Sequence, residues 1–258
     1  MIALNFHRVE PPTGFEINRL SPKRFNQVMD AVEDEIRESA ATESDPERRF
    51  KAIITFDDGF ASIGEHALPE LLRRNSNAGI FLISKFVGRD DAWDFRVLGR
   101  KRPMMTWQQA REWASYGFIF GSHTQTHRDL TALSPAVLKR ELEDSKREIE
   151  DGVGAEVTML SYPFGRHNQR VRDAARDAGY NMAFGLLPKV RGHFDVPRLN
   201  LHSLMTIGEL RRIMRGTALT SWTSRVFATL SAGSATLGNW RSSSTQIDSH
   251  VATRPVVS

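Results

Sequence analysis

The sequence predicts an α/β fold built from repeated strand–helix units. Short apolar runs rich in β-branched and aromatic residues alternate with segments of helical period along most of the 258 residues. Polar residues suited to chemistry directly follow three of these runs, which is where active sites form in parallel α/β folds. The length suits one large α/β domain. Parallel strands joined by crossover helices, in a barrel or a doubly wound sheet, are therefore expected.

The expected elements follow in order from the first residues. Ser21 and Pro22 predict the start of the first long helix, because serine is a preferred N-cap and proline fits the first helical turn. Strands are expected in IALNF, at residues 52–56, and in AGIFLIS, FIF, VTML, MAFGLL and PRLNL. Further helices are expected around 65–74, after Thr106 in a capping box, from LSPAV to Gly152, from NQRV to Gly179, and in TIGELRRIM.

Composition narrows the possible function classes. Lys and Arg number 35 against 31 Asp and Glu, and the small excess is spread along the chain, so no nucleic-acid partner is expected. The chain has no cysteine, so a metal would need His, Asp or Glu as ligands. No run approaches the roughly 20 apolar residues of a transmembrane segment, and the first residues do not resemble a signal peptide. A cytoplasmic protein is expected.

From residue 217 the composition changes to Ser, Thr, Gly and Ala with scattered Arg. Such a segment buries too little apolar surface to offset the entropy of ordering it. We therefore expect one domain over residues 1–216 and a mostly disordered tail over residues 217–258.

Two adjacent carboxylates, Asp57 and Asp58, follow the apolar run IITF. Like charges on neighbouring residues repel unless a cation lies beside them. A plain β-turn is the alternative, because Asp and Gly are both common turn residues. The next polar strand end brings His123 and His127, whose spacing puts both rings on one face of a helical turn. Two His and one Asp make a three-ligand site for a divalent ion, and the other Asp is then available as a general base.

The motifs TFDDG, HTQTH and SYPFG, in this order, resemble the polysaccharide deacetylases of the NodB-homology type, carbohydrate esterase family 4. The likeness covers residues 1–215 approximately. It implies a distorted (β/α) barrel and a hydrolase that removes N-acetyl groups from an N-acetylated saccharide. It also implies a divalent metal, with Zn²⁺ expected and Co²⁺, Ni²⁺ or Mn²⁺ as alternatives.

By motif, the resemblance assigns Asp57 as the general base and Asp58, His123 and His127 as metal ligands. The backbone N–H of Phe164 would stabilise the oxyanion that forms on the acetyl group.

The resemblance also implies groups that contact the substrate. Pro163 and Tyr162 would border it, and Arg198 in VPRLNL would either line the site or lie on the surface. The general acid is expected to be His202 in LNLHS, or else His193 in RGHFD. An ordinary histidine at a strand end is the alternative for His202.

The sequence departs from the family pattern in its third motif. An Arg often stands two residues before the motif's proline, where this chain has Ser161, and a Tyr often follows it, where this chain has Phe164. His7 in FHRV lies near a strand end and either borders the site or is a satisfied buried histidine.

Two other functions stay open. The unclear general acid is compatible with a non-catalytic saccharide-binding protein on the same fold. The same side chains would also suit a non-sugar amide, since fold alone does not fix function. If the protein is cytoplasmic, an intermediate of exopolysaccharide or glycolipid synthesis suits it better than finished cell wall.

Overall fold

The centre of the fold is a closed barrel of parallel strands, and this confirms the predicted fold class. The computed structural model describes residues 2–12, 16–47, 49–91, 101–186 and 192–216, and the predicted tail lies outside them. Seven strands form the barrel: β1 (Ile2–Phe6), β4 (Ala52–Phe56), β5 (Gly79–Leu82), β6 (Ile119–Ser122), β7 (Met159–Ser161), β8 (Met182–Leu186) and β9 (Val196–Asn200). β1 pairs with β9 and so closes the barrel.

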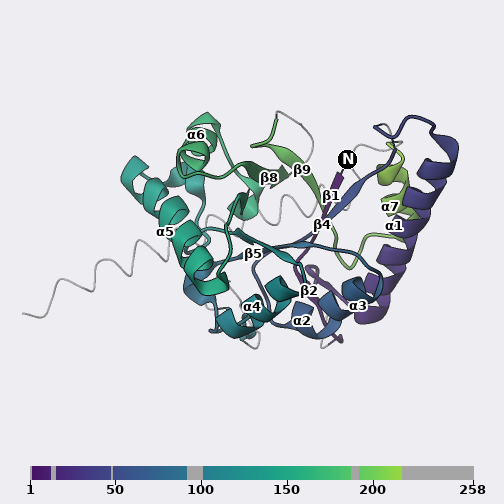
Figure 1. The fold of residues 1–258 in the computed structure, drawn as a ribbon, viewed down its shortest axis with the longest axis horizontal. Helices are drawn as coiled ribbons and strands as arrows, with labels where there is room; N and C mark the ends of the chain where they lie inside the picture. The colour runs from purple at the N-terminus through teal and green to yellow at the C-terminus, as the bar shows by residue number, and fades with distance from the viewer. Residues whose placement is uncertain (1, 13–15, 48, 92–100, 187–191, 217–258) are drawn as a thin grey trace, which may run out of the picture.

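Helices pack around the outside of the barrel (Figure 1). They are α1 (Pro22–Thr42), α2 (Ser62–His66), α3 (Leu68–Arg73), α4 (Trp107–Ser115), α5 (Pro135–Val153), α6 (Gln169–Asp177) and α7 (Ile207–Met214). α1 packs against α7 on one side of the strands, and α5 packs against α6 on the other (Figure 1). Within the described residues, no helix has both the length and the apolar character needed to cross a membrane.

Three short 3₁₀ turns and a small second sheet complete the fold. The turns are Ser84–Phe86, Leu130–Ala132 and Pro163–Gly165, and the sheet pairs β2 (Arg8–Val9) with β3 (Arg19–Leu20). This sheet was not predicted, because two-residue strands leave no periodic pattern in the sequence.

Helix starts agree with the prediction better than helix interiors and ends do. Ser21 caps α1 and Thr106 forms a capping box at α4, as expected. The helix expected around 65–74 is instead two short helices, α2 and α3. α5 continues through Gly152 and ends at Gly154, whose φ is 78°. Gly152 is a packing residue, because a Cβ there would lie 2.3 Å from the ring of Trp107.

The barrel interior has an apolar half and a polar half. Because side chains alternate along a strand, every second residue points inward. The apolar interior consists of Ala3, Phe81, Phe184 and Val196, with Ile53, Met159 and Met182 packed against them. Nearer the carboxyl ends of the strands, the inward positions are buried and polar: Asn5, Thr55, Asp57, His123, Ser161 and Arg198. The candidate site lies at this end.

Candidate active site

The two adjacent carboxylates leave β4 in different directions. Asp57 continues the strand, and its backbone N–H donates to the carbonyl of Phe6 at 2.9 Å. Asp58 has a φ of 71°, in the left-handed region that turns the chain. Gly59 follows with a φ of 78°, and a Cβ there would lie 2.5 Å from the Leu82 side chain. Glycine is therefore required, and the turn points the two carboxylates at different partners.

His123 and His127 come from an irregular turn after β6, not from the helical turn that was predicted. Thr124 and His127 have φ angles of 68° and 60°. The backbone N–H of His127 donates to the Thr124 hydroxyl at 3.1 Å. The two imidazole centroids lie 4.8 Å apart, so the predicted meeting of the rings is confirmed. Each left-handed non-glycine residue costs roughly 1–3 kcal/mol, so other contacts must hold this turn.

Asp58, His123 and His127 form a three-ligand cluster. The Asp58 Oδ1 atom lies 3.5 Å from His123 Nε2 and 3.7 Å from His127 Nε2. Ligand atoms about 2.1 Å from one tetrahedral zinc ion stand roughly 3.4 Å apart, close to the two distances from Asp58. All three ligand atoms lie within 4.8 Å of one another, a spacing that could hold a divalent ion. Among the described residues, no other group of three or more His, Asp or Glu has metal-binding spacing.

The two histidines present neutral rings to this cluster. The Nδ1–H of His123 donates to the Ser161 carbonyl at 2.7 Å, which leaves the Nε2 lone pair toward Asp58. Burial lowers the pKa of His123, against the opposing charge of Asp57. Burial, followed by the charge of His123, holds the pKa of His127 well below its ordinary value. A neutral imidazole is the form that binds a metal.

Asp57 lies beside the cluster, with its Oδ2 3.9 Å from His123 Nε2, and is held by its own donors. Arg198 Nη1 donates to both carboxylate oxygens, at 2.7 and 2.8 Å, and Asn5 Nδ2 donates to Oδ2 at 3.0 Å. Burial alone would raise the pKa of Asp57, but the charge of Arg198 holds it below the usual range. Asp57 is therefore held in the ionised form, which a general base requires.

The guanidinium that binds Asp57 comes from Arg198 on β9. The third motif has no Arg of its own, because Ser161 stands at the position where the family often has one. Arg198 is 2% exposed and lies inside the barrel, with its guanidinium 6.0 Å from the centre of the Phe184 ring. The alternative that Arg198 lies on the surface is therefore wrong. Its predicted contact with the substrate stays a prediction, because the contact that the structure shows is with Asp57.

Asn5 is a site residue that the sequence reasoning missed. Besides Asp57, its Nδ2 donates to Asn200 Oδ1 at 2.9 Å, and its Oδ1 accepts from the Thr55 hydroxyl at 2.9 Å. The signal that could have found it is an amide inside the apolar run IALNF, since a polar side chain in a buried strand needs partners.

The turn after β7 places Phe164 against His127, one of the candidate metal ligands. Phe164 has φ 57° and ψ 10°, and its ring centroid lies 4.7 Å from that of His127. Pro163 is buried within the same turn. Tyr162 is fully buried, and its hydroxyl donates to the Phe194 carbonyl at 3.2 Å. Tyr162 therefore packs behind the turn, and its predicted contact with the substrate has no support in this placement.

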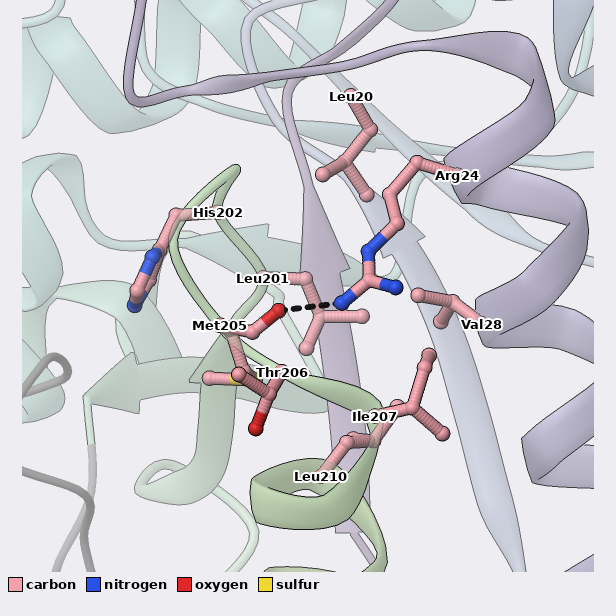
Figure 2. A pocket seen from close by; sticks show the side chains of 9 residues that line it. All are labelled: Leu20, Arg24, Val28, Leu201, His202, Met205, Thr206, Ile207 and Leu210. Carbon is pink, nitrogen blue, oxygen red and sulfur yellow. Dashed lines mark hydrogen bonds between the residues drawn. The ribbon is translucent and has the colours of Figure 1, made fainter.

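His202 follows β9 at the end of the barrel that holds the site, and it is 1% exposed. Burial lowers its pKa, and Glu209 on α7 acts in the opposite direction. A small cavity beside it is lined by Leu20, Arg24, Val28, Leu201, His202, Met205, Thr206, Ile207 and Leu210. Figure 2 shows the His202 ring pointing away from Arg24, which donates to the Met205 carbonyl at 2.6 Å.

The other two histidines considered from the sequence, His7 and His193, lie at opposite ends of the barrel. His7 follows β1 at the site end, where burial lowers its pKa to about 4 while the charge of Asp57 raises it. Asp57 and His123 both lie close enough to His7 to shift its pKa, so His7 borders the site. His193 is exposed and precedes β9, so it lies at the far end of that strand from the site. The prediction of His193 as an acid is therefore wrong.

Known proteins match the region that carries the metal cluster. A family model described as polysaccharide deacetylase matches residues 44–183, more than half of the 258 residues. The chain belongs to the polysaccharide deacetylase family. The stretch of the chain that the family model matches includes both carboxylates, both candidate ligand histidines and Phe164, and it ends before β9 and Arg198.

Individual relatives agree with this assignment. YxkH of Bacillus subtilis (strain 168), whose name describes it as a polysaccharide deacetylase, is 33% identical to this chain over 130 residues. These residues are 50% of this chain and 42% of YxkH. The match thus spans less than half the length of that relative. The deacetylase PplD of Streptococcus pyogenes has a TM-score of 0.68 at 20% identity, covering 83% of this chain and 97% of PplD. IcaB of Ammonifex degensii has a TM-score of 0.63 at 22% identity, covering 83% and 96%. These two structures support the shared fold.

Proposed function

We propose that this polysaccharide deacetylase is a divalent-metal-dependent hydrolase that removes N-acetyl groups from an N-acetylated saccharide. The observation that carries the proposal is the Asp58–His123–His127 cluster with a separate, ionised Asp57 beside it. The family supports sugar deacetylation. The metal requirement, with Zn²⁺ as the expected ion, and the saccharide itself are the finer parts of the proposal.

Different groups of the site would carry out different steps in the hydrolysis of an acetamide. A divalent ion at the cluster would supply Lewis acidity, which lowers the pKa of water and polarises a carbonyl oxygen. Asp57 accepts a proton from the water that attacks the acetyl carbon. The backbone N–H of Phe164 donates to the carbonyl oxygen as negative charge develops on it.

The carbon–nitrogen bond then breaks, and the amine nitrogen takes up a proton as it leaves. His202 is the proposed donor, and His7 is the second candidate because it lies within electrostatic reach of Asp57. The products are acetate and an amino sugar. The structure of PplD, which has this fold, was solved in complex with acetate, the product that this proposal requires.

Acetate release from N-acetylglucosamine oligomers tests the proposal. Purified protein is assayed with Zn²⁺ or Co²⁺ added and, separately, after chelation. We expect release that depends on the metal and stops on chelation. Release that survives complete chelation contradicts the metal requirement. No release from a folded protein that binds Zn²⁺ would favour a non-sugar amide or a binding function.

The cytoplasmic location stays a prediction from the sequence. Fractionation of the native host with an antibody against the protein tests it. Recovery from the medium or the periplasm would contradict it, and would also shift the expected substrate from a biosynthetic intermediate to an exported polymer.

A further inference from the structure

One face of α5 holds the turn that carries both ligand histidines. Glu141, Ser145 and Glu148 share this face, because they are spaced by four and three residues along the helix. The Ser145 hydroxyl bonds the Ser122 hydroxyl at 2.8 Å, and Glu148 accepts from the Gln125 side chain at 3.0 Å. Of the three, Glu141 bonds the backbone of the turn.

Glu141 binds the middle of the turn with both carboxylate oxygens. Its Oε2 accepts from the backbone N–H groups of Gln125, at 3.0 Å, and Thr126, at 2.9 Å. Its Oε1 accepts from the Thr126 hydroxyl. The residue is only 4% exposed, and all three donors are neutral groups.

The two amides that Glu141 binds lie between the two strained residues of the turn. Thr124 and His127 have positive φ angles, whereas Gln125 and Thr126 between them do not. The contact with Glu141 therefore opposes relaxation of the turn toward ordinary backbone angles. Relaxation would rotate the His127 ring away from Asp58, whose Oδ1 lies 3.7 Å from His127 Nε2.

We propose that Glu141 is a positioning residue of the metal site. It fixes the turn so that His123 and His127 meet Asp58. The inference rests on the proposed function, since it requires a divalent ion at this cluster. Removing a group that orients metal ligands typically costs 10- to 100-fold in metal affinity.

The test measures Zn²⁺ binding directly, by isothermal titration calorimetry of the full chain freed of metal. Glu141→Gln removes the charge and sets an amide NH₂ against the donors of the turn. We expect its Zn²⁺ affinity to fall roughly 10- to 100-fold. Glu141→Asp keeps the charge and should lose less affinity than Glu141→Gln.

Glu150→Gln is the matched control. Glu150 is also on α5 and also accepts a backbone N–H, from Val157 at 3.0 Å, but that loop carries no metal ligand. Its Zn²⁺ affinity should stay within about twofold of the wild type. Melting temperatures with and without Zn²⁺ separate the roles, because a merely structural glutamate would lower both equally and leave the affinity unchanged.

The outcomes distinguish this inference from the function beneath it. If the wild type binds no divalent ion, the metal requirement fails and the inference fails with it. If the wild type binds Zn²⁺ and Glu141→Gln binds it equally well, only the inference is overturned. If Glu141→Gln does not fold, Thr126→Val takes its place, because this change deletes one donor to Glu141. The two variants measured are then Thr126→Val and Glu141→Asp. Unchanged affinity in both of these overturns the inference as well.

Discussion

Asp57 and Asp58 acquire different environments through the direction of the backbone alone. Asp57 continues its strand into the barrel, where Arg198 and Asn5 donate to it. Asp58 is turned by its positive φ toward the two histidines. Two identical side chains in adjacent positions can thus serve as a base and as a metal ligand.

Asp57→Asn should abolish turnover and leave Zn²⁺ bound, because the amide keeps the shape of the carboxylate and cannot accept the proton. A general base contributes about 10²–10⁴-fold to the rate, so acetate release should fall by that factor. Calorimetry should show Zn²⁺ affinity near that of the wild type. Asp58→Asn, the neighbouring control, should lose Zn²⁺ binding. Turnover within tenfold of the wild type in Asp57→Asn would refute the assigned role.

Arg198→Met should destabilise the protein more than the double variant Asp57→Asn, Arg198→Met does. The single change leaves Asp57 buried beside an apolar side chain, which costs about 3–5 kcal/mol. The double change removes the charge as well, so the two effects should not add. Urea unfolding of the wild type, both single variants and the double variant measures this coupling. Additive free energies of unfolding would show that the ion pair does not act as a unit.

At the scale of elements, local hydrogen bonds were predictable and long-range ones were not. Ser21 and Thr106 cap helices through bonds to residues three positions away, so a short window of sequence reveals them. The turn of His123 and His127 takes its shape partly from Glu141, on a separate helix, and the sequence suggested a helical turn instead. Tertiary contacts thus replaced the local preference there.

The stability that Glu70 on α3 contributes should be lost in acid. Arg74 links Glu70 on α3 to Asp30 and Glu33 on α1, at 2.6, 2.8 and 2.9 Å. The hydrogen bond from Arg73, with that from Arg74 and against partial burial, lowers the pKa of Glu70 from 4.5 to about 2. A carboxyl with a lowered folded pKa stabilises the fold above its unfolded pKa, and this contribution is lost as pH falls through the folded pKa.

Glu70→Gln should therefore destabilise the protein at pH 7, and the difference from the wild type should shrink as pH falls from about 5 to 2. Urea unfolding at a series of pH values measures it. Glu112→Gln, at an exposed position on α4, is the control and should show no such trend. A difference that does not change with pH would mean that the Glu70 charge does not stabilise the fold.

At the scale of the whole molecule, Zn²⁺ should raise the melting temperature. Free Zn²⁺ at a hundredfold excess over its Kd stabilises the folded state by about 2.7 kcal/mol. For a chain of this size, each kcal/mol shifts the melting temperature by about 2–4 °C, so a rise of roughly 5–10 °C is expected. Scanning calorimetry measures it, and chelation should reverse it. An equal rise in Asp58→Ala would place the ion elsewhere.

The molecule as a whole also explains which site residues the sequence revealed. Asp57, Asp58, His123 and Phe164 all lie within three residues of the end of a barrel strand, and parallel strands bring such positions to one end. Asn5 and Arg198 lie on β1 and β9, which become neighbours only when the barrel closes. Local sequence patterns do not show which strands close the barrel. The sequence therefore did not decide whether Arg198 lines the site or lies on the surface.

Closure of the barrel by β1 and β9 also sets the order of events on the ribosome. Asn5 and Asn200 are 195 residues apart in the chain and hydrogen-bonded to each other. At a translation rate of about 5–20 residues per second, the first strand is made roughly 10–40 s before its partner. During that interval the growing chain has an open strand edge, which is the kind of surface that mispairs and that chaperones cover. Arg198 lies on the same late strand as Asn200, so closure of the barrel and the bonds from Arg198 to Asp57 depend on the same segment of the chain.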